Sequence, residues 1–442
     1  MIQLTSNYSV RATHCDWRES DEMVYQALKR ITSPLGRSWD KLRAAKKIGI
    51  KFNQDKEKRN VVMFENQRTQ LVSDCVVRAT LRLLRESTTA ELFCIDVSFY
   101  RKYVAEAKNE DTTQIRNLLN EFDVTYVDGN ADVTWASVPG GGLMFDRYPV
   151  PRAFTEMDEM ISVQKLKSHA FMGITLCMKN LFGLMPTEPA GRPRTYYHHL
   201  VRMPYMLADL GRLYNPALNI IDGLVCQTGE EWGAGEERRI ANTLVAGDHV
   251  VATDTIGAHL MGHDVTNGDW RTEPFHRDRN PLLVAAESGF GTVNLTEIDY
   301  QGDVVAPVGD EPFFAKITDS PAMVHSWRKT TAEQGLYFRD NQTELTRKYA
   351  GEYILMQMGE VKWHSASGTL EGSRRVLSGD HSEQAMWMKW VDPNGNPEAE
   401  GEHFEVYEKT LASMAVTEGQ AMSLRTKPEG VMIVRGKTGI EN

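Results

Sequence analysis

The chain has 442 residues, and its 50 basic and 60 acidic side chains give a net charge of −10. This acidic balance argues against a general nucleic-acid-binding protein, which needs a basic face to displace counterions from the phosphates. Hydrophobic residues make up 41% of the chain, enough for a large core that needs no disulfide or metal to fold.

The N-terminal residues, the distribution of apolar residues and the cysteines predict the cellular compartment of the protein. The N-terminus has no apolar stretch typical of a secretory signal, and no run of about 18 apolar residues occurs anywhere. The five cysteines lie far apart and form no Cys-x-x-Cys pair, which is typical of reduced thiols. We therefore expect a cytoplasmic protein without a membrane span.

Strand and helix patterns alternate between residues 47 and 305. The predicted strands are 47–52, 90–96, 124–129, 160–166, 218–224 and 241–247. The predicted helices are 21–32, 68–86, 115–122, 173–183, 205–214 and 249–261, with a further one after Asn280-Pro281. Such alternation favours an α/β fold, with a mostly parallel sheet and crossover helices.

The last hundred residues follow a different pattern. Two strands are expected within 353–364 around a turn at Met358 and Gly359, and two more at 385–391 and 403–409. We divide the chain into a helical lead-in (1–44), an α/β core (45–310), a linker (311–340) and a small α+β module (341–442).

The densest polar cluster is the run Lys165-Leu166-Lys167-Ser168-His169, directly after an apolar strand. In α/β sheets, ligands bind beyond the carboxyl ends of the strands. Two ammonium groups and an imidazole at that edge would hold a carboxylate or a phosphate, and His169 could move a proton near neutral pH. The competing interpretation is a solvated loop.

Further polar side chains are expected at the same edge of the sheet, namely Lys51, Asn53, Lys179, Asn180, His198 and Asp222. Asp248 and Asp254 are candidate metal ligands. The commoner role for an Asp such as Asp248 is a helix N-cap, and a carboxylate such as Asp254 on an apolar helix needs a partner. His259 and His263 have the spacing of metal ligands but lack the glutamate of a zincin motif.

The segment 163–186 resembles the Domain of Unknown Function 362 family, whose pattern is Pro-Lys-x-Lys-x-His, Thr-x-x-x-Lys-Asn-x-x-Gly and a later His. The residues on this pattern are Lys165, Lys167, His169, Thr175, Lys179, Asn180, Gly183 and His198 or His199, with Gln164 in place of the usual Pro. The stretches IGIKFN, IIDGLV, LVAGDHVVATDTIGAHLMG and NPLLVAAESGFGTVNL are also similar to the family, so the resemblance covers about residues 45–305. Residues 345–363 are similar to a second uncharacterised small domain family.

The resemblance implies a fold akin to the α/β domains of the nickel-dependent lactate racemase group, and it implies no particular reaction. Many members of the family carry a ferredoxin-like, iron–sulfur-associated extension. This chain has no cysteine-rich insert, so an iron–sulfur cluster held by this chain alone is not expected.

We favour an enzyme that acts on a small anionic substrate or cofactor. His169 and Lys167 would be the catalytic residues, the remaining lysines, asparagines and His198 would bind the ligand, and Asp222 and Asp254 would tune the lysines or hold a metal ion. The alternative is a non-catalytic protein that binds an anion or cofactor, or matures one. The reaction, the cofactor, a homo-oligomer and a redox partner stay open.

Overall fold

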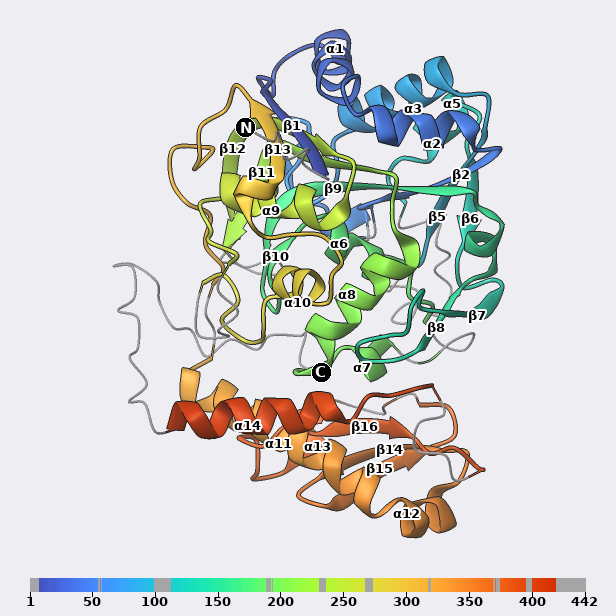
Figure 1. Ribbon diagram of the computed structural model, residues 1–442, viewed down its shortest axis with the longest axis vertical. Helices are drawn as coiled ribbons and strands as arrows, with labels where there is room; N and C mark the ends of the chain where they lie inside the picture. Colours follow the sequence, from blue (N-terminus) through green and yellow to red (C-terminus); the bar gives the residue numbers. More distant parts are fainter. Residues whose placement is uncertain are drawn as a thin grey trace, which may run out of the picture.

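The computed structural model describes residues 8–54, 56, 58–98, 113–187, 192, 194–229, 236–266, 273–316, 319–368, 370, 374–394 and 400–418. Figure 1 shows an α/β core above a smaller C-terminal module. The core is built on one sheet with the strand order β13-β1-β12-β11-β9-β2-β5-β6, and β10 also pairs with β9.

The strands of this sheet are β1 (Tyr8–His14), β2 (Lys47–Phe52), β5 (Glu91–Asp96), β6 (Thr125–Asp128), β9 (Glu159–His169), β10 (Gly173–Thr175), β11 (Leu218–Gly229), β12 (Glu236–Gly247) and β13 (Ile298–Gly302). The block β11-β9-β2-β5-β6 is parallel. β12 runs antiparallel to β11, because the six residues between them are too few for a crossover connection. The α/β class with a mostly parallel sheet is confirmed.

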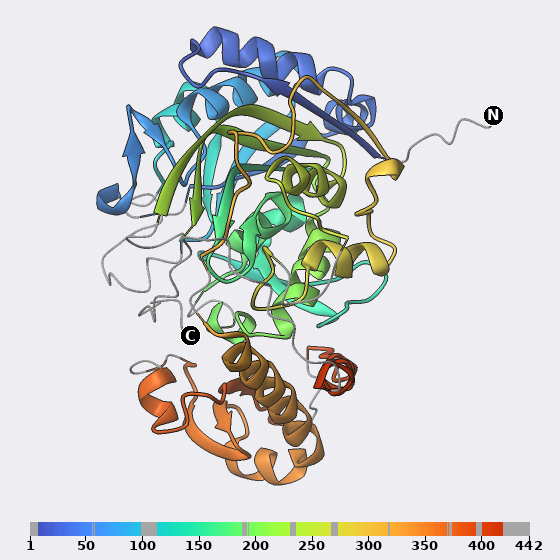
Figure 2. The ribbon, with the colours of Figure 1, turned by 90° about the vertical axis from the view of Figure 1, so that its left-hand side faces the viewer.

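Helices cover both faces of the sheet (Figure 2). One face carries α1 (Asp21–Thr32), α2 (Gly36–Ala44), α3 (Asp74–Ser87) and α5 (Arg116–Glu121). The other face carries α6 (Cys177–Asn180), α8 (Arg202–Tyr214), α9 (Val250–Leu260) and α10 (Pro281–Glu287). Side chains alternate along β9, so Ile161 and Val163 pack beneath α3, whereas Met160 and Leu166 pack on the α6 side.

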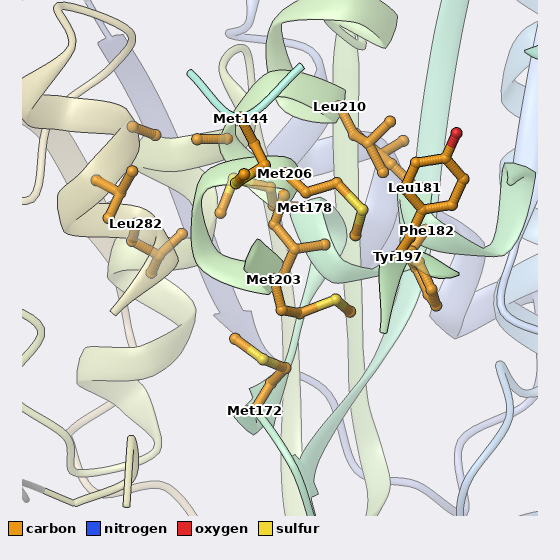
Figure 3. Close-up of a cluster of buried hydrophobic side chains, with 14 of the residues drawn as sticks. Met144, Met172, Met178, Leu181, Phe182, Tyr197, Met203, Met206, Leu210 and Leu282 are labelled. Carbon is orange, nitrogen blue, oxygen red and sulfur yellow. The ribbon is translucent and has the colours of Figure 1, made fainter. Parts of the chain in front are cut away.

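The core on the α6 side is rich in methionine. Figure 3 shows Met144, Met172, Met178, Met203 and Met206 gathered beside Phe182 and Leu210. Methionine fills irregular gaps well because its side chain is unbranched and polarizable. This packing fixes the short helix α6, whose four residues make too few hydrogen bonds to be stable alone.

Several segments of the core differ from the prediction. Helix α3 begins at Asp74 and not at residue 68, which belongs to the short strand β4 (Gln67–Arg68). The expected helix 173–183 begins instead with strand β10, and only Cys177–Asn180 is α-helical, followed by a 3-10 turn at Leu181–Leu184. Ile174 and Thr175 are β-branched and suit a strand. Strand β1, within the expected helical lead-in, was not predicted because it carries the charged Arg11, which is buried and paired with Asp299 at 2.5 Å.

Smaller elements complete the core. The hairpin β3–β4 comprises Met63–Phe64 and Gln67–Arg68, the hairpin β7–β8 comprises Val133–Ser137 and Arg147–Pro151, and α7 spans Arg194–Tyr197. Single 3-10 turns lie at Lys58–Asn60, Arg152–Glu156 and Leu295–Glu297.

The C-terminal module has the sheet order β15-β14-β16. Its elements are α11 (Pro321–Asp340), α12 (Gln342–Tyr349), β14 (Tyr353–Gln357), β15 (Glu360–Ser365), α13 (Arg374–Ser378), β16 (Trp387–Trp390) and α14 (Glu405–Glu418). The turn at Met358 and Gly359 is confirmed by its positive φ angles of 54° and 76°. The 20-residue helix α11 occupies much of the expected linker.

The predicted strand 403–409 is wrong, because this segment leads into helix α14. Phe404, Tyr407, Thr410 and Met414 are buried, and their spacing of three and four is that of one helix face. Over a window of seven residues, the pattern also resembles the alternation of a strand.

A buried charge cluster joins the module to the core. The Arg202 side chain on α8 donates to Glu402 Oε1 at 2.8 Å, to the Tyr407 hydroxyl at 2.7 Å and to the Met388 carbonyl at 2.8 Å. Lys389 pairs with the second oxygen of Glu402 at 2.5 Å. All these charged side chains are at most 1% exposed.

All five cysteines are free and buried. Burial raises the pKa of the Cys15 thiol to about 11 and that of Cys75 to about 12. Within the described residues, none of the helices combines the length and the apolar character needed to cross a bilayer.

Candidate functional site

The Lys-x-Lys-x-His run lies inside strand β9 and not in a loop. Lys165, Lys167 and His169 are 0%, 4% and 6% exposed. Because side chains alternate along a strand, all three leave the same face of the sheet. This is the face that carries α3, since the Lys165 ammonium donates to Ser73 Oγ, at the N-terminus of that helix, at 2.9 Å.

Lys165 is neutralised within the protein. Its Nζ lies 2.7 Å from Asp222 Oδ2, and neither side chain is exposed. The same carboxylate accepts hydrogen bonds from the backbone N–H groups of Ser73 at 2.7 Å and Leu224 at 3.1 Å. The pair therefore fastens α3 to β9 and β11.

Two polar atoms that lack a partner in the described part of the chain flank Lys167. Gln227 on β11 and Thr175 on β10 are both in register with Lys167, so the three side chains form one row on one face. Gln227 Oε1 and Thr175 Oγ1 are buried and have no hydrogen-bond partner among the described residues. Each such atom costs about 1–3 kcal/mol, which a bound ligand or water would offset.

His169 closes the turn between β9 and β10. Its Nδ1 accepts hydrogen bonds from the backbone N–H groups of Phe171 at 2.9 Å and Met172 at 3.1 Å. Because an accepting nitrogen carries no proton, the neutral ring carries its proton on Nε2. Proton exchange with a ligand would therefore use Nε2.

Lys51 lies on the opposite face of the sheet from Lys165. Its neighbours Ile50 and Phe52 pack on the α3 side, so Lys51 points to the α6 side. There its ammonium pairs with Asp96 at 2.7 Å. Gly183 makes room for it, since a Cβ on Gly183 would lie 2.7 Å from Lys51 Cε.

Asn180 holds α6 against the sheet. Its side-chain nitrogen donates to the Lys51 carbonyl and to Ser162 Oγ, both at 3.0 Å, and to the Val163 carbonyl at 3.2 Å. Asn180 was expected to orient a ligand, and these contacts give it a structural role.

Asn53 and Gln164 form a second set of unsatisfied groups. Asn53 follows the end of β2, and its N–H donates to the Val163 carbonyl at 3.0 Å, next to Gln164. Asn53 Oδ1 and both amide atoms of Gln164 are buried without a hydrogen-bond partner in the described part of the chain. Sequence reasoning missed Gln164 and Gln227 as site residues, although an amide inside an apolar strand could have indicated them.

Lys179 and His198 meet at an aromatic ring near the β9–β10 turn. The Lys179 ammonium lies 4.8 Å from the ring centroid of Phe182, and the His198 ring lies 5.9 Å from it and 4.5 Å from Phe171. Lys179 also lines a hollow of about 20 Å³ together with Asp254 and the methionine cluster, close to the volume that one water needs.

The two candidate metal ligands have other partners. Asp248 accepts from the Ser9 N–H at 2.8 Å and pairs with Arg37 at 2.7 Å. It is not the N-cap of α9, a position that His249 occupies without a side-chain bond. No group of three or more His, Cys, Asp or Glu side chains able to hold a metal occurs among the described residues, so the metal assignment gains no support.

Asp254 caps the start of α6. Its two oxygens accept from the N–H groups of Cys177 at 2.8 Å and Met178 at 2.7 Å. Burial raises the pKa of this carboxyl to about 7, although the two amides act in the opposite direction.

Comparisons with known proteins agree with the resemblance. Residues 58–259 match the family described as Domain of unknown function (DUF362). The chain is also 29% identical over 125 residues to the "Thylakoid-associated protein sll1697" of Synechocystis sp. (strain ATCC 27184 / PCC 6803 / Kazusa). That match covers 27% of this chain and 37% of the relative. No solved structure matches the chain.

Proposed function

We propose that this chain, whose residues 58–259 match the DUF362 family, is an enzyme that acts on a small anion carrying a hydroxyl group. The observation that carries the proposal is the row of Gln227, Lys167 and Thr175 on three neighbouring strands. In this row a buried ammonium lies between two polar atoms that have no hydrogen-bond partner among the described residues, at an edge of the sheet where α/β proteins bind ligands.

Each group of the row suits one part of such a ligand. The Lys167 ammonium attracts a carboxylate or phosphate group. Gln227 Oε1 accepts a hydrogen bond, so it needs a donor such as a hydroxyl, and Thr175 Oγ1 can donate or accept. His169 lies two residues from Lys167 on the same face and would exchange a proton through Nε2.

The second candidate function is non-catalytic binding of the same anion, and one observation favours it. His169 Nδ1 is engaged by two backbone N–H groups, so the ring also has a structural role in the β9–β10 turn. A carrier or maturation protein would need the row around Lys167 without any proton transfer by His169.

Anion-dependent thermal stability tests the site. A ligand that binds only the folded state stabilises it by about 2.7 kcal/mol at a hundred times its Kd. We expect phosphate and glycolate to raise the Tm of the wild type, acetate to raise it less, and Lys167→Met to abolish the rise. The exposed Lys46 supplies the matched control Lys46→Met, with sodium chloride at equal ionic strength.

The variant His169→Asn separates the two functions. Its amide oxygen is bonded to Cγ, as Nδ1 is, so it can accept the same two backbone hydrogen bonds but cannot act as an acid or base near neutral pH. An enzyme should therefore keep the anion-dependent rise in Tm and lose turnover of the bound anion. A wild type whose Tm responds equally to glycolate, acetate and chloride would contradict both functions.

The cellular location and the partners of the protein are predictions from the sequence. We infer a cytoplasmic location from the sequence, while the matched relative is named thylakoid-associated. A homo-oligomer or a redox partner stays open. An iron–sulfur cluster is not part of the proposal, since the chain lacks a cysteine-rich insert.

A further inference from the structure

A second hollow lies apart from β9, at the C-terminal end of α9. Its volume is about 380 Å³, and the described residues that line it include His259, His263, Val265, Val293, Leu295 and Pro307. Pockets for small molecules typically begin at about 300 Å³ and are mostly apolar with a few polar groups. The size and the lining of this hollow match that description.

His263 is a buried polar group of this hollow; the other buried one, Thr255, already donates to the Thr292 carbonyl at 3.1 Å. The residue is 7% exposed, and its Nε2 is buried with no hydrogen-bond partner among the described residues. It lies just beyond α9, where Gly262 turns the chain with a φ of +87°. Burying an imidazole nitrogen without a hydrogen-bond partner destabilises the folded state, and a hydrogen bond to a ligand would offset this cost.

The chemistry of the ring selects the ligand. Burial lowers the pKa of His263 to about 4, so the ring is neutral at pH 7 and offers one donor and one acceptor nitrogen. A neutral ring gives an anion no charge attraction, whereas a hydroxyl group can both donate and accept. The apolar wall of Val265 and Val293, which are 3% and 8% exposed, favours a hydrocarbon body.

We propose that this hollow binds a small, mostly apolar molecule that carries one hydroxyl group, hydrogen-bonded to His263. None of the residues that line it belongs to the row around Lys167. The inference therefore stands independently of the anion site.

Fluorine NMR with 4-fluorophenol and fluorobenzene as probes tests this proposal. We expect saturable line broadening of both probes with the wild type, and a Kd about fivefold lower for 4-fluorophenol, the ratio that one net hydrogen bond supplies. His263→Phe should make the two probes bind equally. Replacing the exposed His364 in the same way, as His364→Phe, should leave the fivefold ratio unchanged.

A variant that fills the hollow completes the test. Val293→Trp should remove the binding of both probes. If circular dichroism shows that it does not fold, Leu295→Trp takes its place, since Leu295 is 40% exposed and tolerates a larger side chain better. No saturable binding to the wild type, or undiminished binding to the folded filled variant, would overturn the proposal.

Discussion

Asp254 shows how strongly burial acts on a single side chain. Two backbone N–H groups at the start of α6 point at its carboxylate, and such bonds alone would lower its pKa. Burial is the larger effect and raises the pKa to about 7. The folded protein therefore holds this proton at pH values where the unfolded chain has released it.

This difference predicts a pH dependence of stability. Between about pH 4 and pH 7 the folded state binds one more proton at Asp254 than the unfolded state, so the contribution of Asp254 to stability falls as the pH rises, by up to about 1.4 kcal/mol per pH unit. Asp254→Asn removes the titration. We expect the variant to be less stable than the wild type at pH 5, and the gap to narrow towards pH 7, in urea unfolding.

The comparison of the wild type with Asp254→Asn separates the effect of this carboxyl on stability from the effects of other titrating groups. Buried histidines such as His249 and His276, with pKa values lowered to about 4 by burial, act in the opposite direction, and they are the same in both proteins. Stability curves that run parallel from pH 5 to pH 7 would show that Asp254 is ionised throughout.

At the scale of elements, the sequence predicts what is encoded locally. Strands β9 and β11 were found because apolar residues dominate their first halves, as expected for strands that are covered on both faces. The short strand β10 and helix α14 were misassigned because windows of three to seven residues fit either periodicity. Strand β1 was missed because the partner of Arg11, Asp299, is 288 residues away.

The candidate site was predicted in part for the same reason. The sequence groups Lys165, Lys167 and His169 but places most of the run after a strand that ends at residue 166. The common face of the three side chains follows from the continuation of β9 to His169. The row that includes Gln227 depends on a register shift in β11 after Asp222, which no local pattern reveals. Lys51 was expected beside these residues, but strand alternation puts it on the other face.

The pair of Lys165 and Asp222 tests how α3, β9 and β11 are held together. Removing one partner of a buried ion pair typically costs about 3–5 kcal/mol, because the other charge stays buried. We expect Lys165→Met to lower the free energy of unfolding, measured in urea, by this amount. The double variant Lys165→Met/Asp222→Asn should recover part of the lost stability. A double variant as unstable as the sum of both single variants would show that the two side chains act independently.

At the scale of the whole molecule, Arg202 is one of the buried polar links between the α/β core and the C-terminal module, beside the ion pairs Arg328–Asp278 and Arg192–Glu400. It contacts the module at Glu402, Tyr407 and Met388. Because this cluster is buried, each charge depends on the others for compensation. The module should therefore unfold more easily once Arg202 is lost.

Arg202→Met is expected to destabilise the protein by about 3–5 kcal/mol and to speed hydrogen exchange in α14 and β16 before β9 and β11. The exposed pair of Arg339 and Glu408, which joins α11 to α14, supplies the control. Arg339→Met should cost no more than about 1 kcal/mol. Uniformly faster exchange across core and module in Arg202→Met would show that the two units unfold as one.

The five buried thiols carry a practical consequence. They lie next to β1, in α3, in β5, in α6 and in β11, so each marks a different part of the core. A thiol that is both inaccessible and protonated does not react with an alkylating agent until its surroundings open. The alkylation rate of each cysteine therefore reports local opening of its own part of the core, and mass spectrometry can measure it site by site without any engineered label.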